Sequence, residues 1–314
     1  MRIVLIIGNG FDLDLGLKTQ FSHFADSHYW PTRPKGNAIM YDVLNQQKKI
    51  SKWLDLEQLL VKFASVRNAA TSSVYASSDK CFFDNLSQSL SLYLKEQQEC
   101  EIKKSSIAAK LLQAVLSVNH WVKIYSFNYT DLHVLSQKLG LTSKFEYEHV
   151  HGSLKDNSVI LGIPDSADVH LNYEFLYKTF NRNYTSHEIL YDLLDADEVI
   201  FFGHSLSPVD YHYFQRFFQM QCRSDMKRSE GKQISIFTYD ESARISILKQ
   251  LRFMNDKRTD LLRNQNDFKI FMTDGSDDEN VNAFLTDFST RVRQRYIRHA
   301  LEATKSIIPN DFKF

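Results

Sequence analysis

The stretch IIGNGFDLDLGLKT, residues 6–19, joins the end of an apolar run to a glycine-rich turn. The apolar run covers residues 3–7 and stops at Gly8, and Asn9 and Gly10 follow at once. Glycines directly after a strand let the backbone turn sharply into a helix and bring its N–H groups close to an anion. The stretch therefore predicts a strand–turn–helix unit that could bind a nucleotide phosphate, while an ordinary βα turn remains the alternative.

Six more short apolar runs follow, separated by segments in which apolar residues recur at helical spacing. The runs cover residues 122–127, 145–150, 159–161, 199–202, 234–239 and 268–271. Strands that alternate with helices are typical of an α/β fold with a mainly parallel sheet. Residues 20–120 show helical patterns and no convincing strand. We therefore expect one α/β domain over residues 1–314, with a helical insertion or cap over 20–120.

Several of the predicted strands end in small or polar residues. These endings are Gly8 and Gly10, Asn128, the His149-Val150-His151-Gly152 group, and the Gly203-His204-Ser205 group. The carboxyl ends of neighbouring parallel strands lie along one edge of a sheet, and ligands bind there at a topological switch point. The pattern therefore predicts one site assembled from segments that are far apart in the chain.

Composition excludes several classes of protein. The chain has 314 residues, 43% of them hydrophobic, and its 38 Lys+Arg balance 38 Asp+Glu, which argues against a protein that coats nucleic acid. The three cysteines are far apart and include no C-x-x-C pair, so neither a zinc module nor a disulfide framework is expected. No apolar run approaches the ~18 residues of a membrane span. We expect a cytoplasmic protein with no metal and no membrane contact.

The motifs resemble those of the AbiH family of bacteriophage abortive-infection proteins. The N-terminal signature over residues 6–24 is followed, in that family's order and approximate spacing, by four further stretches. These are WLDLEQLL (53–60), SFNYTD (126–131), HVHGS (149–153) and FFGHSLSPVDYHYF (201–214). The resemblance covers roughly residues 1–240 and implies a role in phage defence.

The same ordered motifs are more remotely similar to the sirtuin-like NAD-binding fold. Sirtuins that deacylate proteins carry a four-cysteine zinc module after their His-Gly element, whereas this chain has only Cys222 after residue 151. The resemblance therefore implies hydrolysis of NAD to nicotinamide and ADP-ribose, and not protein deacylation. It also implies the site residues. Asn128 and His151 would be catalytic, and NAD would be bound by Gly8, Asn9, Gly10, Phe11, Asp12, Thr19, Gly152, Gly203, His204 and Ser205.

The residue types suit this chemistry. An imidazole titrates near neutral pH, so His151 can act as a general base, and the Asn128 amide can both donate and accept hydrogen bonds to a ribose. Each role has a purely structural alternative. His151 could be a core histidine, Asn128 could form a turn, and Asp12 could cap a helix. Asp210 fits the negative charge of a helix start. Trp53, Asp55 and Glu57 are expected in core or surface positions.

Two other functions stay open at this point. One is a module that senses NAD or an ADP-ribose derivative without turnover, and the other is a toxin that acts on nucleic acid, which the neutral charge disfavours. A homo-oligomer or a phage-derived trigger would be compatible with either. The expected partner in all but the last case is NAD or a related nucleotide.

Overall fold

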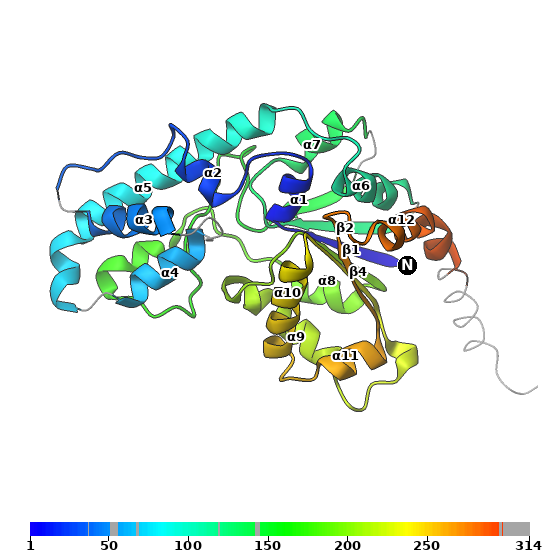
Figure 1. Ribbon diagram of the computed structural model, residues 1–314. Helices are drawn as coiled ribbons and strands as arrows, with labels where there is room; N and C mark the ends of the chain where they lie inside the picture. Colours follow the sequence, from blue (N-terminus) through cyan, green and yellow to red (C-terminus); the bar gives the residue numbers. More distant parts are fainter. Residues whose placement is uncertain are drawn as a thin grey trace, which may run out of the picture.

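The computed structural model of the protein describes residues 1–36, 38–50, 56–66, 69–118, 120–141, 145–294 and 297. One six-stranded sheet with order β3-β2-β1-β4-β5-β6 runs through the molecule, and all its neighbouring strands are parallel (Figure 1). The strands are β1 (Arg2–Ile7), β2 (Trp121–Ser126), β3 (Glu146–His149), β4 (Glu198–Phe202), β5 (Gln233–Thr238) and β6 (Asp267–Met272). This is the strand order of the doubly wound dinucleotide-binding fold. The predicted α/β class with a parallel sheet is confirmed.

Helices cover both faces of the sheet, because the central strands are apolar on both sides. Ile3, Leu5 and Ile7 of β1 belong to one buried cluster, whereas Val4 and Ile6 belong to another. The first cluster packs under α1 (Asn9–Asp14), α6 (Ile107–Ser117), α7 (Leu132–Lys138) and α12 (Asp278–Thr286). The second packs under α8 (Ile189–Asp195), α9 (Tyr211–Met220), α10 (Glu241–Met254) and α11 (Thr259–Gln265).

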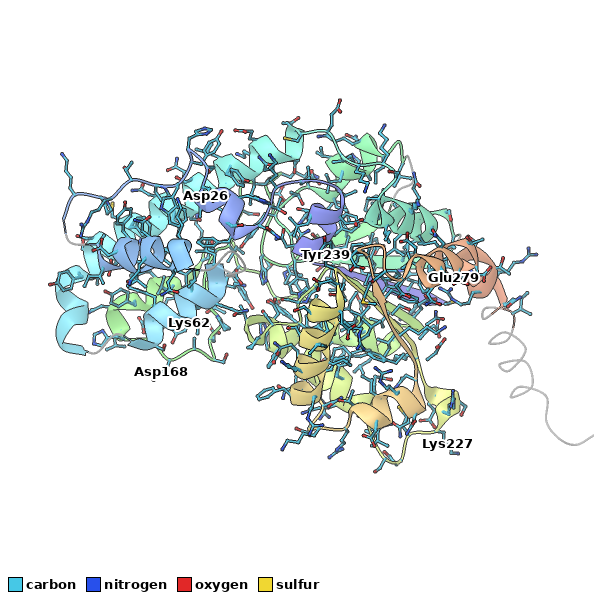
Figure 2. The ribbon with its side chains drawn as sticks, in the orientation of Figure 1. Asp26, Lys62, Asp168, Lys227, Tyr239 and Glu279 are labelled. Carbon is cyan, nitrogen blue, oxygen red and sulfur yellow. The ribbon has the colours of Figure 1, made fainter. Side chains whose placement is uncertain are left out.

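A third buried cluster lies beyond the carboxyl ends of the strands, in a body that we call the cap. It comprises α2 (Phe21–Ala25), α3 (Ile39–Ile50), α4 (Leu56–Val66) and α5 (Ala69–Glu99), joined by residues 154–180 with the short helices η1 (Leu171–Leu176) and η2 (Lys178–Phe180). Figure 1 shows the cap on the left, beyond α1, and Figure 2 places Lys62 of α4 and Asp168 of the second segment on that same side. The cap is thus built from two separate stretches of the chain.

Two expectations need correction. Residues 159–161 were predicted as a strand, but they form no strand, and their apolar side chains Val159 and Leu161 pack into the cap cluster instead. The apolar run reflects burial against α4 and α5 and not pairing in the sheet. The described residues within 20–120 include the helices α2 to α6, and the last of these, α6, lies on the sheet with Ala108, Leu111 and Leu112 in the first cluster. The cap helices therefore end with α5.

Candidate functional site

The turns after β1 and β4 are pressed together at the switch point of the sheet. Gly10 N–H donates to Gly203 O at 2.9 Å, and Gly8 N–H donates to Phe202 O at 2.9 Å. A Cβ added to Gly10 would lie 2.6 Å from Gly203 Cα, and one added to Gly8 would lie 2.5 Å from His204 Cα. Gly203 also has φ +63°, a left-handed conformation that glycine adopts without strain. These glycines are needed because two backbones meet there.

This packing corrects the predicted use of the first turn. The N–H groups of Gly8, Gly10 and Phe11 all donate to backbone carbonyls, so none of the three is directed at an anion. The Phe11 side chain is fully buried and meets Phe202 edge to face at 5.5 Å, which makes it part of the sheet core. Gly152 adopts φ +75° against Ser158 O and serves the backbone turn. Gly10 and Gly152 therefore serve the packing of the backbone, and Phe11 serves the core of the sheet.

The remaining predicted residues come together around one cavity of about 400 Å³ between the strand ends and the cap. Its walls include both catalytic candidates and most of the predicted binding residues, namely Gly8, Asn9, Asp12, Thr19, Asn128, His151, Gly203, His204 and Ser205. The cap contributes Phe21, Phe24, Leu56, Glu57, Leu90 and Leu94. Segments more than a hundred residues apart thus form one site.

Asn128 belongs to a buried cluster at the ends of β1 and β2. Its Nδ2 donates to Gly8 O at 3.1 Å and to Asp12 Oδ1 at 2.9 Å, and Thr130 Oγ1 donates to Asp12 Oδ2 at 2.8 Å. We call Asp12, Asn128 and Thr130 the asparagine cluster. Burial raises the pKa of Asp12 to about 7, although the hydrogen bonds from Thr130 and Asn128 work in the opposite direction. The amide of Asn128 is fixed, with its Oδ1 left as an acceptor.

His151 belongs to a second buried cluster at the ends of β3 and β4. Its Nε2 lies 3.1 Å from Asp210 Oδ1, and His204 Nε2 lies 3.5 Å from the other oxygen of Asp210. The His204 ring is set by its own turn, since Leu206 N–H donates to His204 Nδ1 at 3.0 Å. Asp210, at the end of η3 (Pro208–Asp210), is therefore a partner of two imidazoles. It does not act only as the charge of a helix start.

The cap completes this second cluster. Lys178 Nζ of η2 lies 3.1 Å from His151 Nε2 and 3.5 Å from Nδ1, and it donates to Glu57 Oε2 of α4 at 2.7 Å. We call His151, Asp210, His204, Lys178 and Glu57 the histidine cluster. Lys178 and Glu57 are nearly enclosed, with side chains 6% and 14% exposed. Two of the five members, Lys178 and Glu57, thus come from the cap, and the other three come from segments that follow β3 and β4.

The charges in the histidine cluster divide between neutral and ionised groups. Burial lowers the pKa of His151, and the nearby Lys178 charge lowers it further, so the imidazole is neutral at pH 7. Burial alone would raise the pKa of Asp210, but hydrogen bonds from His151 and His204 and the Lys178 charge hold it well below its usual range. The contact between His151 and Asp210 is therefore a hydrogen bond from a neutral ring to a carboxylate. That bond favours the tautomer with the proton on Nε2 and leaves Nδ1 basic. In this tautomer the Lys178 ammonium, 3.1 Å from Nε2, acts on the ring through its charge and not as a hydrogen-bond donor to Nε2.

Sequence reasoning missed part of this site. Lys178 stands alone in the stretch YKTF, where no pattern distinguishes it from a surface lysine. Glu57 was assigned to the core or surface, although its place in a family-like motif was a usable signal. Trp53 and Asp55 of the same motif lie outside the described residues. His149 stays close to the site, with Nδ1 2.9 Å from Asn128 O.

Two further features, a metal site and a membrane span, are absent from the described residues. Within the part of the chain that the structure describes, no group of three or more His, Cys, Asp or Glu side chains could hold a metal ion. No helix in that same part is long and apolar enough to cross a bilayer. Among the described residues that line the cavity there is no Lys or Arg, whereas Asp12, Glu57 and Asp210 are acidic. The Asp and Glu side chains among these lining residues are therefore set in walls that are mostly apolar.

Comparison with known proteins adds a family to this geometry. A solved structure described as "Structural Basis for the Mechanism and Regulation of Sir2 Enzymes" is similar over 83% of this chain and 93% of that chain, with 13% identity and a TM-score of 0.31, which supports no argument about function. No curated protein matches the sequence. The family model described as "Bacteriophage abortive infection AbiH" matches residues 4–228, a range that contains the cavity-lining turns, Lys178 and Asp210. The chain belongs to the AbiH family of bacteriophage abortive-infection proteins.

Proposed function

We propose that this protein acts in phage defence by hydrolysing NAD, or a closely related nucleotide, to nicotinamide and ADP-ribose. One observation carries the proposal. Asn128 and His151 line the same cavity at the switch point of a doubly wound sheet, and each is held by its own buried aspartate. Ligands of such sheets bind at this place, and paired polar residues with fixed orientations are what a glycosidic cleavage needs.

The proposed reaction is displacement of nicotinamide by water. The water oxygen bonds to C1′ of the ribose while the C1′–N bond breaks, and its electron pair leaves with neutral nicotinamide. His151 takes the proton of the attacking water on Nδ1, while Asp210 stabilises the imidazolium through Nε2. The transition state has oxocarbenium character, so positive charge grows on the sugar. No metal takes part in this proposal.

Asn128 would orient the sugar. Its amide nitrogen is already engaged by Gly8 O and Asp12, which leaves Oδ1 to accept a hydrogen bond from a ribose hydroxyl. A fixed acceptor of this kind brings the anomeric carbon into line with the water near His151. Asn128 thus has a binding role that does not depend on proton transfer.

The charge of the cavity favours the nicotinamide riboside end of the substrate. Asp210 is ionised and can complement a cationic ring and a developing oxocarbenium ion, whereas Asp12, with a pKa of about 7, is only partly ionised and Glu57 is paired with Lys178. The pyrophosphate would meet neutral donors, because no Lys or Arg is among the described lining residues. Asn9 and Thr19, joined by a 2.6 Å hydrogen bond, and the Ser205 hydroxyl are the candidates. This assignment replaces the backbone N–H groups of Gly8 and Gly10.

An NAD-cleavage assay tests the proposal. Purified wild-type protein is expected to release nicotinamide, and His151→Gln is expected to abolish release at equal protein level. His133→Gln serves as the matched control, because His133 is an exposed histidine on α7. NAD binding without any release by wild type would contradict hydrolysis and favour a sensor. Absence of both binding and release would contradict the proposal as a whole.

A further inference from the structure

Lys178 is a buried cation with defined partners that lies against the cavity wall without lining it. Only 5% of the residue is exposed, and its ammonium group contacts Glu57 and both ring nitrogens of His151. Burial of an ammonium is costly unless it is paired and hydrogen-bonded, which the Glu57 contact provides. The arrangement therefore needs both partners.

The backbone fixes Lys178 where it is. Lys178 N–H donates to Ile163 O at 3.0 Å, and Ile163 N–H donates to Leu176 O at 2.8 Å. Gly162 packs against the lysine stem so closely that an added Cβ would lie 3.2 Å from Lys178 Cγ and 2.4 Å from Leu176 O. The ammonium thus reaches His151 from a rigid segment of the cap.

Within the described part of the chain, three charged side chains act on His151. Asp210 approaches from η3, Lys178 from η2 and Glu57 from α4, while Phe127 and Tyr213 cover the ring with apolar surface. His204 lies on the far side of Asp210. Asp210 and Glu57 favour the imidazolium, and Lys178 opposes it. Lys178 is the single cation in this set.

We propose that Lys178, anchored by Glu57, is a positioning residue that keeps the His151 imidazole neutral and oriented, so that the cap supplies the electrostatics of the general base. The inference rests on the proposed function, because it assigns a role within the same site. A base must be unprotonated before it can take a proton from water. Two carboxylates near the ring favour its protonated form, and burial and the Lys178 charge oppose that form. Lys178 and Glu57 thus adjust, from the cap, the pH range in which His151 can act as a base.

Two variants give opposite expectations. Lys178→Met removes the cation and keeps a stem of similar length, so the acidic limb of the pH–rate profile should move upward by about 1 pH unit or more. Glu57→Gln removes the anion that offsets Lys178, so the same limb should move downward. Lys178→Arg keeps the charge and should restore the wild-type limb. A purely structural role would lower the rate without moving the limb.

A titration that needs no turnover separates this inference from the proposed function. The His151 imidazole is followed by NMR with histidine labelled at Cε1, and its signal is assigned by its loss in His151→Gln. His151 should titrate at higher pH in Lys178→Met than in wild type, and at unchanged pH in Lys62→Met, which removes an exposed lysine from the cap helix α4.

The outcomes are distinct. Titration of His151 at the same pH in wild type, Lys178→Met and Glu57→Gln overturns the role of Lys178, whether or not NAD is cleaved. Failure of the wild type to cleave NAD overturns the proposed function, whatever the titration shows. If Lys178→Met does not fold, Glu57→Gln and Lys178→Arg still decide the matter, because one predicts a shift and the other predicts none.

Discussion

The asparagine cluster and the histidine cluster flank one cavity but are built differently. Asp12, Asn128 and Thr130 all come from segments that directly follow β1 and β2, and their hydrogen bonds close without any cap residue. The histidine cluster needs Lys178 and Glu57, which belong to the cap. The difference teaches that the two roles we propose, sugar binding and proton transfer, have separate structural supports. The asparagine cluster is held by the strand ends alone, and the histidine cluster also depends on contacts from the cap.

The largest expected effect separates the two clusters directly. His151→Gln should lower turnover by about 10²- to 10⁴-fold and leave NAD binding within a few fold, because a lost general base affects the proton and not the anchor. Asn128→Ala should weaken binding and turnover together. Calorimetry with NAD and the cleavage assay measure the two quantities. Equal loss of NAD binding in both variants would mean that the two clusters do not have separate roles.

A change at the switch point should disturb both clusters at once. Gly10→Ala places a Cβ 2.6 Å from Gly203 Cα, so the two turns must separate, and we expect a loss of about 3 kcal/mol in unfolding free energy. Gly140→Ala is the control, because Gly140 has φ +75° but no heavy atom within 4 Å of an added Cβ. It should cost about 1 kcal/mol of backbone strain. The losses of unfolding free energy are measured by denaturant unfolding. A larger loss in Gly140→Ala than in Gly10→Ala would contradict the close contact.

The asparagine cluster should leave its own mark on stability. The folded pKa of Asp12 is about 7 and its ordinary value is 3.8, so the folded state binds more protons between these values. Stability contributed by Asp12 is therefore full below pH 3.8 and is lost as pH rises toward 7, by about 2 kcal/mol from pH 5 to pH 7. Asp12→Asn keeps an oxygen that accepts from Asn128 Nδ2, while its new Nδ2 can only donate to Thr130 Oγ1, and the uncharged side chain should remove this slope. Chemical unfolding from pH 5 to pH 7 measures this dependence of unfolding free energy on pH. The same dependence in wild type and Asp12→Asn would mean that Asp12 is not its source.

The smallest expected effect concerns one hydroxyl. Thr130→Val removes the 2.8 Å donor to Asp12 at nearly constant volume, and it should cost about 1 kcal/mol. It should also steepen the pH dependence of stability, because that hydrogen bond favours the ionised Asp12. Thr286→Val on the exposed end of α12 is the matched control and should change stability by less than about 0.5 kcal/mol. A flatter pH profile in Thr130→Val would mean that Thr130 does not act on the ionised form.

The same contrast explains what could be predicted from sequence. The strands β1, β4 and β5 are buried on both faces and appear as nearly continuous apolar runs, whereas the edge strands β3 and β6 are partly exposed. All six strands of the sheet were predicted, together with the polar ends that bring Asn128 and His151 to one cavity. The strand predicted over residues 159–161 was wrong, because three apolar residues indicate that a segment is buried but not which element buries it.

The histidine cluster was harder to predict than the asparagine cluster. Lys178 and Glu57 are 121 positions apart and meet only because two stretches of the cap fold together. The glycine turn was predicted to bring backbone N–H groups close to a phosphate, whereas Gly8 and Gly10 pack against a second turn of the same chain. Sequence spacing indicates that a backbone must come close to something, and it does not indicate to what.

The two-part construction of the cap has a consequence for the order of events during synthesis. A ribosome adds ~5–20 residues per second, and the first cap helices emerge long before residues 154–180, which complete their hydrophobic cluster. Asp210 follows later still. The nascent chain therefore carries Asn128 and His151 for some seconds before the lysine, and then the aspartate, that we propose prepare the imidazole for catalysis. We expect an NAD-consuming protein built in this way to be harmless while it is being translated, and to become dangerous to its host only once the last contributor to the site has been made.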